Sequence, residues 1–522
     1  MSMATLLSRI TGFIRMWATA LALGATAISS SYTIANNVPN MIFELVAGGI
    51  LSSLFIPTFM DVRKERGQEG AWRFASHVFN IFVLVLGAVA LIGTLFPEPF
   101  IWTQTFRMTS QKALEVRSTA EFLFRFFAIQ VVLYGGGMVI QAILNASRRY
   151  LWTALGPVFN NLVVIGTMLF VATQPLNNRT LIILAIGTTL GVAAMFLVMI
   201  PSLRKTELKY YFELGLKDPA VRRMLKLAIP GLLYVVTNLI TVSFRTASAL
   251  SVESSGPAVL TYAWTWYQLP YGILAVALAT ALFTELSECA TNQNMTAFKT
   301  TLSSGLRQTA LLIMPCAGIL YALATPLTTL FMAGRFTEQD IPAVAGVLRT
   351  WALALTFYAC MMFVLRSFYS LKDTKTPAIA NLGTSLIQMG GYLVLTTGIG
   401  AWGGFGLRGI PLSDLIFCAL QFGILAYLLR RKIGSFDFKS FVSVFARMFI
   451  ASSLGAVASY GVLHLLRPYF SGVSGSLVII VIGAAIGLII AFGTASLLRV
   501  KEIAQAKSML KKVLHKLGRK KA

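Results

Sequence analysis

The sequence predicts an all-α polytopic membrane protein with fourteen transmembrane helices, arranged as two pseudo-symmetric six-helix lobes followed by two C-terminal helices. Apolar residues make up 56% of the chain and charged residues only 12%, about half the charged share of a soluble domain. The mean hydropathy is +0.74. Apolar runs of about 20 residues, the length that crosses a bilayer, recur between short charged segments.

Fourteen stretches qualify as membrane spans. They cover approximately residues 5–28, 31–60, 74–97, 119–146, 152–173, 180–202, 221–250, 257–289, 301–332, 341–370, 376–398, 406–430, 441–466 and 474–498. Because this number is even, both termini should lie on the same side of the membrane. The first stretch is interpreted as a retained helix rather than a signal peptide, since Arg9 and Arg15 interrupt it.

The basic residues are unevenly distributed between the two sets of loops. One set, together with the tail from residue 499, holds 30 of the 44 Lys and Arg residues, whereas the opposite loops hold seven. Because Lys and Arg concentrate in cytoplasmic loops, both termini are predicted to be cytoplasmic. Anionic lipid headgroups facing these loops account for the net charge of +25. Nucleic acid is not expected as a partner, because no soluble surface is left to bind it.

The tail from residue 499 to 522 has apolar residues near helical spacing and lysines on the other face. It is predicted to be a basic amphipathic helix on the inner leaflet, with a solvated basic tail as the alternative. The four cysteines and three histidines are scattered, so the sequence predicts neither a disulfide framework nor a metal site.

Two pairs of similar segments indicate two related halves. Pro157 and Asn161 match Pro377 and Asn381 at an offset of 220 residues, and Pro39 matches Pro270 at an offset of 231. Repeats that face each other across a central site are a recurrent plan of transporters.

The resulting domain prediction divides the chain into five parts. These are an N-lobe at 1–202, a cytoplasmic linker at 203–220, a C-lobe at 221–432, helices thirteen and fourteen at 433–498, and the tail at 499–522.

The strongest candidate site lies on the first two helices. In helix two, polar and small side chains fall on one face at spacings of three and four: Asn37, Asn40, Glu44, Gly48 and Ser52. Helix one has a similar stripe that includes Arg15, with Arg9 roughly 120° around the helix. A charge inside the membrane should face protein or water rather than lipid, so Glu44 is expected to line a cavity near an arginine.

Two interpretations of these charges remain open. Arg15 and Glu44 could form an ion pair that only holds two helices together. Two arginines near one glutamate, however, leave a positive excess that calls for an anionic ligand. Further candidates for the cavity are Arg245 in helix seven, with Thr265 and Gln268 in helix eight.

Helices two and eight also contain residues that allow a helix to bend. The predicted hinge residues are Pro39, Gly48, Gly49, Pro270 and Gly272.

Several motifs resemble the MurJ (MviN) family of lipid II flippases, members of the exporter superfamily of multidrug, oligosaccharidyl-lipid and polysaccharide (MOP) transporters. They are "SRITGFIR" at 8–15, "VPNMIFELVAGGILSSLFIPTF" at 38–59, "LPYGILAVALAT" at 269–280, "GRFT" at 334–337 and "FYSLKDTKTP" at 368–377. They recur in family order up to about residue 377.

The resemblance implies a MATE-like plan, in which two lobes surround a central cationic cavity and helices thirteen and fourteen form a lipid-facing groove. The implied partner is lipid II, the undecaprenyl-diphosphate-linked disaccharide-pentapeptide, flipped from the inner to the outer leaflet of the bacterial cytoplasmic membrane by alternating access. The cavity arginines would hold the diphosphate. No cofactor is implied. Coupling would be to the membrane potential or a monovalent cation, with Asn238 and Asn381 as sodium candidates.

The chain also departs from the best-studied branch of that family. Met16 replaces an acidic residue, Ser30 an aspartate, and Phe43 and Glu44 basic residues, while Thr265 and Gln268 replace an arginine and a glutamate. This cavity is therefore expected to be less charged than in that branch.

The sequence also leaves one alternative to lipid II transport open and excludes another class of protein. The alternative within the same fold is an exporter of another polyprenyl-linked oligosaccharide or of a drug. An enzyme is not expected, because the spans contain no clustered carboxylates, activated histidine or metal set.

Overall fold

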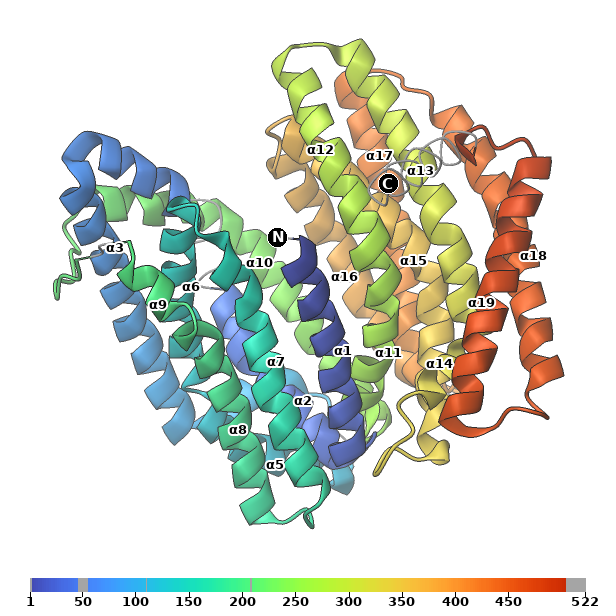
Figure 1. The fold of residues 1–522 in the computed structure, drawn as a ribbon, viewed down its shortest axis with the longest axis horizontal. Helices are drawn as coiled ribbons and strands as arrows, with labels where there is room; N and C mark the ends of the chain where they lie inside the picture. Colours follow the sequence, from blue (N-terminus) through green and yellow to red (C-terminus); the bar gives the residue numbers. More distant parts are fainter. Residues whose placement is uncertain (1, 46–54, 109, 207–208, 504–522) are drawn as a thin grey trace, which may run out of the picture. The chain divides into compact units, whose positions relative to one another are not determined.

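The computed structural model describes residues 2–45, 55–108, 110–206 and 209–503 (Figure 1). Within these ranges the regular structure is helical, apart from two isolated β-bridges that join Ala333 to Phe336 and Ile399 to Trp402. The chain divides into two compact units, one formed by residues 1–261 and 333–337 and the other by residues 262–332 and 338–522. The predicted all-α class is confirmed.

Unit 1 contains ten helices within the described ranges and the start of an eleventh. They are α1 (Ser2–Leu23), α2 (Ala27–Phe43), α3 (Ile56–Leu95), α4 (Pro97–Thr105), α5 (Gln111–Phe127), α6 (Gln130–Ala146), α7 (Tyr150–Ala172), α8 (Asn178–Leu197), α9 (Ile200–Arg204), α10 (Pro219–Val252) and the beginning of α11 (Gly256–Pro270). The principal packing partners are α1 with α7, α7 with α8, α3 with α6, and α2 with α5.

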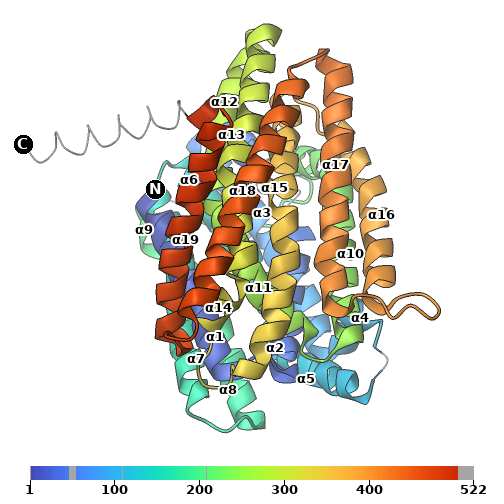
Figure 2. The same ribbon diagram turned by 90° about the vertical axis from the view of Figure 1, so that its right-hand side faces the viewer.

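Unit 2 contains the rest of α11 and the remaining helices. They are η3 (Tyr271–Ala275, a π-helix), α12 (Val276–Thr291), α13 (Met295–Ala322), α14 (Ala324–Thr329), η4 (Glu338–Asp340), α15 (Ile341–Ser370), α16 (Lys375–Thr397), η5 (Gly406–Arg408), α17 (Gly409–Ile433), α18 (Phe438–Leu466) and α19 (Gly472–Leu497). Helices α18 and α19 lie side by side in both views (Figures 1 and 2).

Small residues bring α18 and α19 together. A Cβ added to Gly455 would lie 2.5 Å from the carbonyl oxygen of Gly487. The Ser459 hydroxyl donates a 2.8 Å hydrogen bond to the carbonyl of Gly483. Close backbone approach through small residues is the usual way in which transmembrane helices pair.

Eleven helices in the described part of the chain are long and apolar enough to cross a membrane. The number is twelve if α5 and α6, bent by 43° at their junction, form one span. The first two predicted spans fall on α1 and α2, of which α2 has 17 residues. The chain is thus a multi-pass membrane protein, and the count of fourteen stays a prediction.

The third predicted span differs from the structure at its start. Residues 60–75 were expected to form a loop, but they are helical and belong to α3, which runs for 40 residues. Gly67 breaks α3 with a φ of 72°, a conformation that glycine adopts without strain. The charged residues of this stretch therefore lie on a helix rather than in a loop. Charged side chains do not prevent this, since they are compatible with a helix surface that is exposed.

The domain boundaries remain a prediction. The structural units follow packing, and they place α10 in unit 1, whereas the predicted lobes follow the sequence repeat and start the C-lobe at 221.

The predicted tail helix lies outside the described residues from position 504 onward. The first residues of the predicted tail, up to 503, are described. There the Arg307 Nε atom donates a 2.5 Å hydrogen bond to the Glu502 carboxylate, and Val500 and Ile503 are buried.

A short segment from the middle of the chain completes unit 1. Residues Ala333–Thr337, which we call the strap, contact the C-terminal ends of α1 and α7. The Arg335 guanidinium donates hydrogen bonds to the carbonyls of Ala22 at 2.5 Å, Gln174 at 2.6 Å and Val171 at 3.5 Å. It therefore satisfies carbonyls that helix ends leave without an intrahelical partner.

Two glycines allow the strap to approach α1 closely. Gly24 follows α1 with a φ of 64°, and a Cβ there would lie 2.3 Å from the Arg335 carbonyl oxygen. Gly334 has a φ of 55°, and its Cβ would lie 2.4 Å from the carbonyl oxygen of Leu21. Any other residue at either position would be strained and would push the strap away from the helix end.

The linker between α9 and α10 is fixed to α3. The amide of Asn80 donates to the carbonyls of Tyr211 and Glu213, at 2.9 and 2.8 Å. The His77 ring lies 3.2 Å from the Asp218 carboxylate and 3.3 Å from that of Glu213. Since Asp218 also caps the N-terminus of α10, one cluster joins α3, the linker and α10.

Electrostatics adds to this attachment. Burial alone would raise the pKa of the Asp218 carboxyl. Hydrogen bonds from the Ala220 amide, Arg66 and His77, together with the Arg66 charge, outweigh burial and hold that pKa below its ordinary value. The ionised carboxylate therefore stabilises the folded linker.

We predict that Arg335→Gln destabilises the protein, because glutamine is too short to reach the three carbonyls. Leaving buried carbonyls unpaired should lower the free energy of unfolding by about 1–3 kcal/mol. The measurement is the thermal unfolding midpoint of purified protein in detergent. Arg179→Gln, at an exposed arginine without a side-chain partner in the described chain, is the matched control. Equal midpoints for the two variants would contradict the role of the strap.

We also predict that attachment of the linker is lost in acid. A carboxyl with a lowered pKa stabilises the folded state above its unfolded pKa of about 4, and the stabilisation disappears as the pH falls through the lowered value. In wild type, hydrogen-exchange protection of residues 209–218 should decrease below about pH 4. Asp218→Asn should reduce protection at pH 7 by about fivefold, near 1 kcal/mol, and remove the acid transition. An unchanged acid transition in that variant would refute the assignment.

Candidate functional site

Helix α1 is fixed against α7 by a polar contact. The Asn161 amide of α7 donates to the Thr11 hydroxyl at 3.0 Å and to the Ser8 carbonyl at 3.3 Å. Gly12 lies beside the same amide, where a Cβ would be 3.7 Å from its nitrogen. These contacts set the rotation of α1 and hence the positions of its two arginines.

Arg15 lies half-buried in the middle of α1, and Arg9 lies exposed two turns earlier. The Arg15 charge acts on the hydroxyls of Tyr32 and Tyr134, so the guanidinium lies near α2 and α6 within unit 1. Neither arginine forms an ion pair or a hydrogen bond with another side chain in the described part of the chain. Among the described residues, the Arg15 charge therefore has no carboxylate partner and lies near two tyrosine hydroxyls.

The polar stripe of α2 lies near the same tyrosines. Asn37 and Asn40 are half-buried, and the Asn40 side chain lies near the Tyr134 hydroxyl. The Tyr32 hydroxyl lies 3.2 Å from that of Thr188. Arg15 and Asn40, which the sequence placed in one site, thus both lie near Tyr134.

Glu44 lies at the end of α2, where it is exposed and forms the C-cap. It pairs with no arginine among the described residues, so the structure gives no support to the Arg15–Glu44 ion pair. Pro39 lies inside α2, four residues before the helix ends, while Gly48 and Gly49 lie outside the described residues. The hinge assignment therefore stays a prediction for all three residues.

Arg245 and Asn238 lie half-buried on α10, two helical turns apart. Around Arg245 the helix carries hydroxyls that bind α4 and the residues after it. The Gln104 amide donates to the Ser243 hydroxyl at 2.7 Å, and Arg107 donates to that of Ser248 at 2.8 Å. This part of α10 thus has a polar contact surface within unit 1.

The remaining candidates belong to unit 2. Thr265 and Gln268 lie half-buried on α11. Pro270 ends that helix, and the following residues, including Gly272, form the π-helix η3. A single π-turn after a proline is a common place for a helix to bend, which favours the hinge prediction at Pro270 and Gly272.

The second sodium candidate, Asn381, is buried on α16. Asn238 and Asn381 belong to different compact units, so their joint role as cation ligands stays a prediction. The described residues contain no group of three His, Cys, Asp or Glu side chains that could hold a metal ion.

Several polar residues of α2 and α6 were not predicted from the sequence as part of the site. Tyr32 and Tyr134 were taken as part of apolar runs, although their hydroxyls lie near Arg15. Asn36 has a buried side-chain oxygen that accepts no hydrogen bond in the structure. A search for polar tips on aromatic residues at span interiors could have found the tyrosines.

Asp414 is a charged residue inside a predicted span to which the sequence assigns no role, and the structure shows it buried on α17. Its carboxylate accepts hydrogen bonds from the Trp351 indole and the Gln388 amide, both at 2.7 Å, and from the Tyr392 hydroxyl. These donors come from α15 and α16, so the carboxylate joins three helices of unit 2. All three donors are neutral, as their residue types require.

Comparison with known proteins identifies the family. A family model described as lipid II flippase MurJ matches residues 19–483. The chain belongs to the MurJ family. The match begins after Arg9 and Arg15.

Curated relatives cover most of the chain at modest identity. A protein of Buchnera aphidicola (subsp. Acyrthosiphon pisum), named probable lipid II flippase MurJ, is 26% identical over 475 residues and covers 90% of each chain. The lipid II flippase MurJ of Burkholderia cenocepacia is 26% identical over 414 residues, which is 76% of this chain and 79% of that protein.

Solved structures agree with this assignment. A lipid II flippase MurJ in an inward closed conformation matches with a TM-score of 0.76 and 25% identity, over 94% of this chain and 97% of that one. An inward-facing multidrug resistance MATE family transporter of the MOP superfamily matches with a TM-score of 0.66 and 15% identity, over 83% of this chain and 94% of that one. The second likeness shows that this MurJ-family chain shares the fold of that transporter.

We predict that Arg15→Ala lowers transport by about tenfold or more while the protein still folds, because a lost hydrogen bond to a charged ligand weakens binding by about 1.5–3 kcal/mol. The measurement is the flux of labelled lipid II in proteoliposomes. The elution volume of the purified variant in size-exclusion chromatography shows whether it is folded. Glu44→Gln should have a smaller effect, and Arg179→Ala should have none. Wild-type flux in Arg15→Ala would exclude the arginine from the site.

Proposed function

We propose that this MurJ-family chain moves lipid II from the inner to the outer leaflet of the bacterial cytoplasmic membrane by alternating access. The observation that carries the proposal is Arg15, a guanidinium inside the first helix without an acidic partner in the described chain. A charge at this depth is expensive unless a ligand or water compensates it. The diphosphate of a polyprenyl-linked precursor supplies the opposite charge.

The chemistry of the substrate fits the residue types on α1 and α2. Arginine binds phosphate oxygens through a planar fork of donors, which favours a diphosphate over a neutral sugar. Asn37 and Asn40 add amide donors on the neighbouring helix, and Arg245, Thr265 and Gln268 are further candidates. Arg9, which is exposed nearer the start of α1, would meet the headgroup first. A cationic site also disfavours drug cations.

The polyprenyl tail would lie along the C-terminal helices. An apolar cavity of about 370 Å³ opens between α13, α15 and α18 of unit 2, where Phe357, Phe445 and Phe449 line it. Apolar side chains such as Phe449, Val457 and Leu477 are exposed along α18 and α19. These surfaces support the proposed groove, because a hydrocarbon tail needs an apolar path that is open to the bilayer.

The proposed orientation places both termini in the cytoplasm, in keeping with 30 basic residues on that side against seven. The driving force is proposed to be the membrane potential or a monovalent cation, with Asn238 and Asn381 as candidates for a sodium site. The protein is proposed to be a transporter and not an enzyme.

A transport assay tests the proposal. Purified protein in proteoliposomes receives labelled lipid II or a polyprenyl-diphosphate carrying an unrelated glycan, and the label that reaches the opposite leaflet is measured. We expect flux of lipid II to exceed that of the unrelated lipid by about tenfold, which corresponds to 1.4 kcal/mol of discrimination. Preferential flux of the unrelated glycan would identify the chain as another MOP-type exporter.

A further inference from the structure

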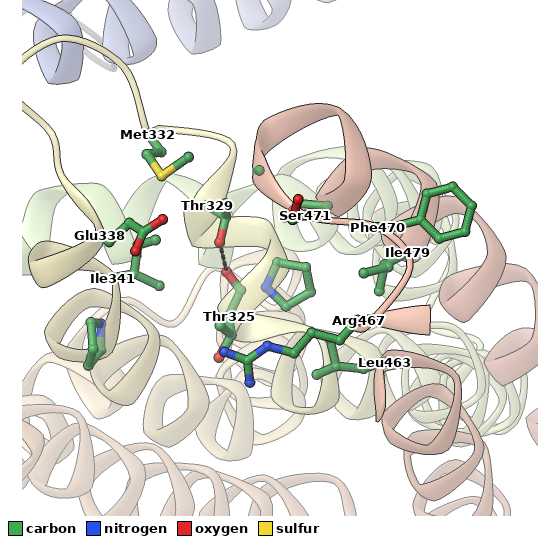
Figure 3. A pocket seen from close by; sticks show the side chains of 14 residues that line it. Thr325, Thr329, Met332, Glu338, Ile341, Leu463, Arg467, Phe470, Ser471 and Ile479 are labelled. Carbon is green, nitrogen blue, oxygen red and sulfur yellow. Dashed lines mark hydrogen bonds between the residues drawn. The ribbon is translucent and has the colours of Figure 1, made fainter. Parts of the chain in front are cut away.

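A second cavity lies at the end of the helices of unit 2. Its volume is about 320 Å³, and residues of α14, α15, α18 and α19 and of the loops that join them form its walls. The size is at the lower end of ligand pockets and suits a small headgroup. Figure 3 shows Arg467 and Glu338 on different sides of it, with Thr325 and Thr329 between them.

The two charged side chains of this cavity have opposite signs and no partners. Arg467 follows the end of α18, and Glu338 begins η4. Neither side chain makes an ion pair or a hydrogen bond with another residue in the described part of the chain. Both are therefore available to a ligand with one negative and one positive group.

The side of the cavity next to Arg467 also has hydroxyl groups. The Thr325 hydroxyl accepts a 2.8 Å hydrogen bond from Arg349, which leaves its own hydrogen to donate. Ser471 precedes α19, and its side chain makes no capping hydrogen bond to that helix. A phosphate beside Arg467 would thus meet further donors from these hydroxyls.

The remaining walls are apolar and lead toward the lipid. Leu463, Phe470 and Ile479 line the cavity next to Arg467. On the same two helices Leu465 is 72% exposed and Leu477 is 53% exposed, so an acyl chain that leaves the cavity would find an apolar surface. A ligand with a hydrocarbon tail therefore fits better than a soluble one.

We propose that this cavity binds the headgroup of a zwitterionic phospholipid with a primary amine, of the phosphatidylethanolamine type. Arg467 binds the phosphate, and Glu338 binds the ammonium group. The site does not depend on which lipid-linked glycan is transported. In the orientation proposed above it lies in the outer leaflet.

Lipid retention by the full-length protein tests this proposal. Purified protein in detergent is titrated with phosphatidylethanolamine or phosphatidylglycerol, and bound lipid is counted by native mass spectrometry. Phosphatidylglycerol has the phosphate but lacks the amine. Because both charged groups are exposed, we expect about fivefold tighter binding of phosphatidylethanolamine, near 1 kcal/mol.

Two variants separate the two charges. Glu338→Gln should remove the preference by lowering only the binding of phosphatidylethanolamine, whereas Arg467→Gln should lower the binding of both lipids. Both positions are exposed, so neither variant should impair folding. The matched controls are Glu288→Gln and Arg430→Gln, at exposed residues that do not line the cavity.

Three results would overturn the proposal. One is equal binding of the two lipids by the wild type, and another is an unchanged preference in Glu338→Gln. The third is loss of lipid II binding, but not of phosphatidylethanolamine binding, in Arg467→Gln. That result would assign the cavity to the transported substrate, whereas failure of lipid II transport alone would leave the headgroup site standing.

Discussion

A positive charge in the middle of α1, the first predicted membrane span, is the constraint on which this structure depends. Arg15 cannot leave the apolar zone as a residue at a helix end can, and no carboxylate in the described chain neutralises it. Desolvating a guanidinium costs several kcal/mol, so its surroundings must return much of that free energy. The hydroxyls of Tyr32 on α2 and Tyr134 on α6 lie near this charge, and an anionic ligand would return most of that free energy.

A small number of polar side chains in unit 1 position α1 and therefore the Arg15 charge. Asn161 fixes α1 on α7, Asn40 contacts Tyr134, and Arg335 closes the ends of α1 and α7. Each contact joins segments that are distant in the sequence. Inside a bilayer such hydrogen bonds orient helices that apolar packing alone would leave free to rotate, because lipid tails are as apolar as the side chains.

The sequence was sufficient for the class of fold and for most helix positions, because long apolar runs signal membrane spans directly. It also pointed to Arg15 and Asn40, since helical spacing places residues on faces. It could not reveal the partners of Arg335, Asp414 or His77, which come from helices far apart in the chain. Spacing within one helix carries no information about which neighbour it meets. The helical course of residues 60–75 was missed because charge alone does not distinguish a loop from an exposed helix.

The strap also has a consequence for how the protein can be labelled or lengthened. The close contacts at Gly24 and Gly334 and the three hydrogen bonds of Arg335 hold residues 333–337 against the helix ends. An epitope or fluorophore inserted there would shift Arg335 out of reach of its carbonyls. The turn at residues 399–403 has exposed Ile399, Gly400 and Trp402, so extra residues can extend from it into solvent. Reporter groups therefore belong in that turn.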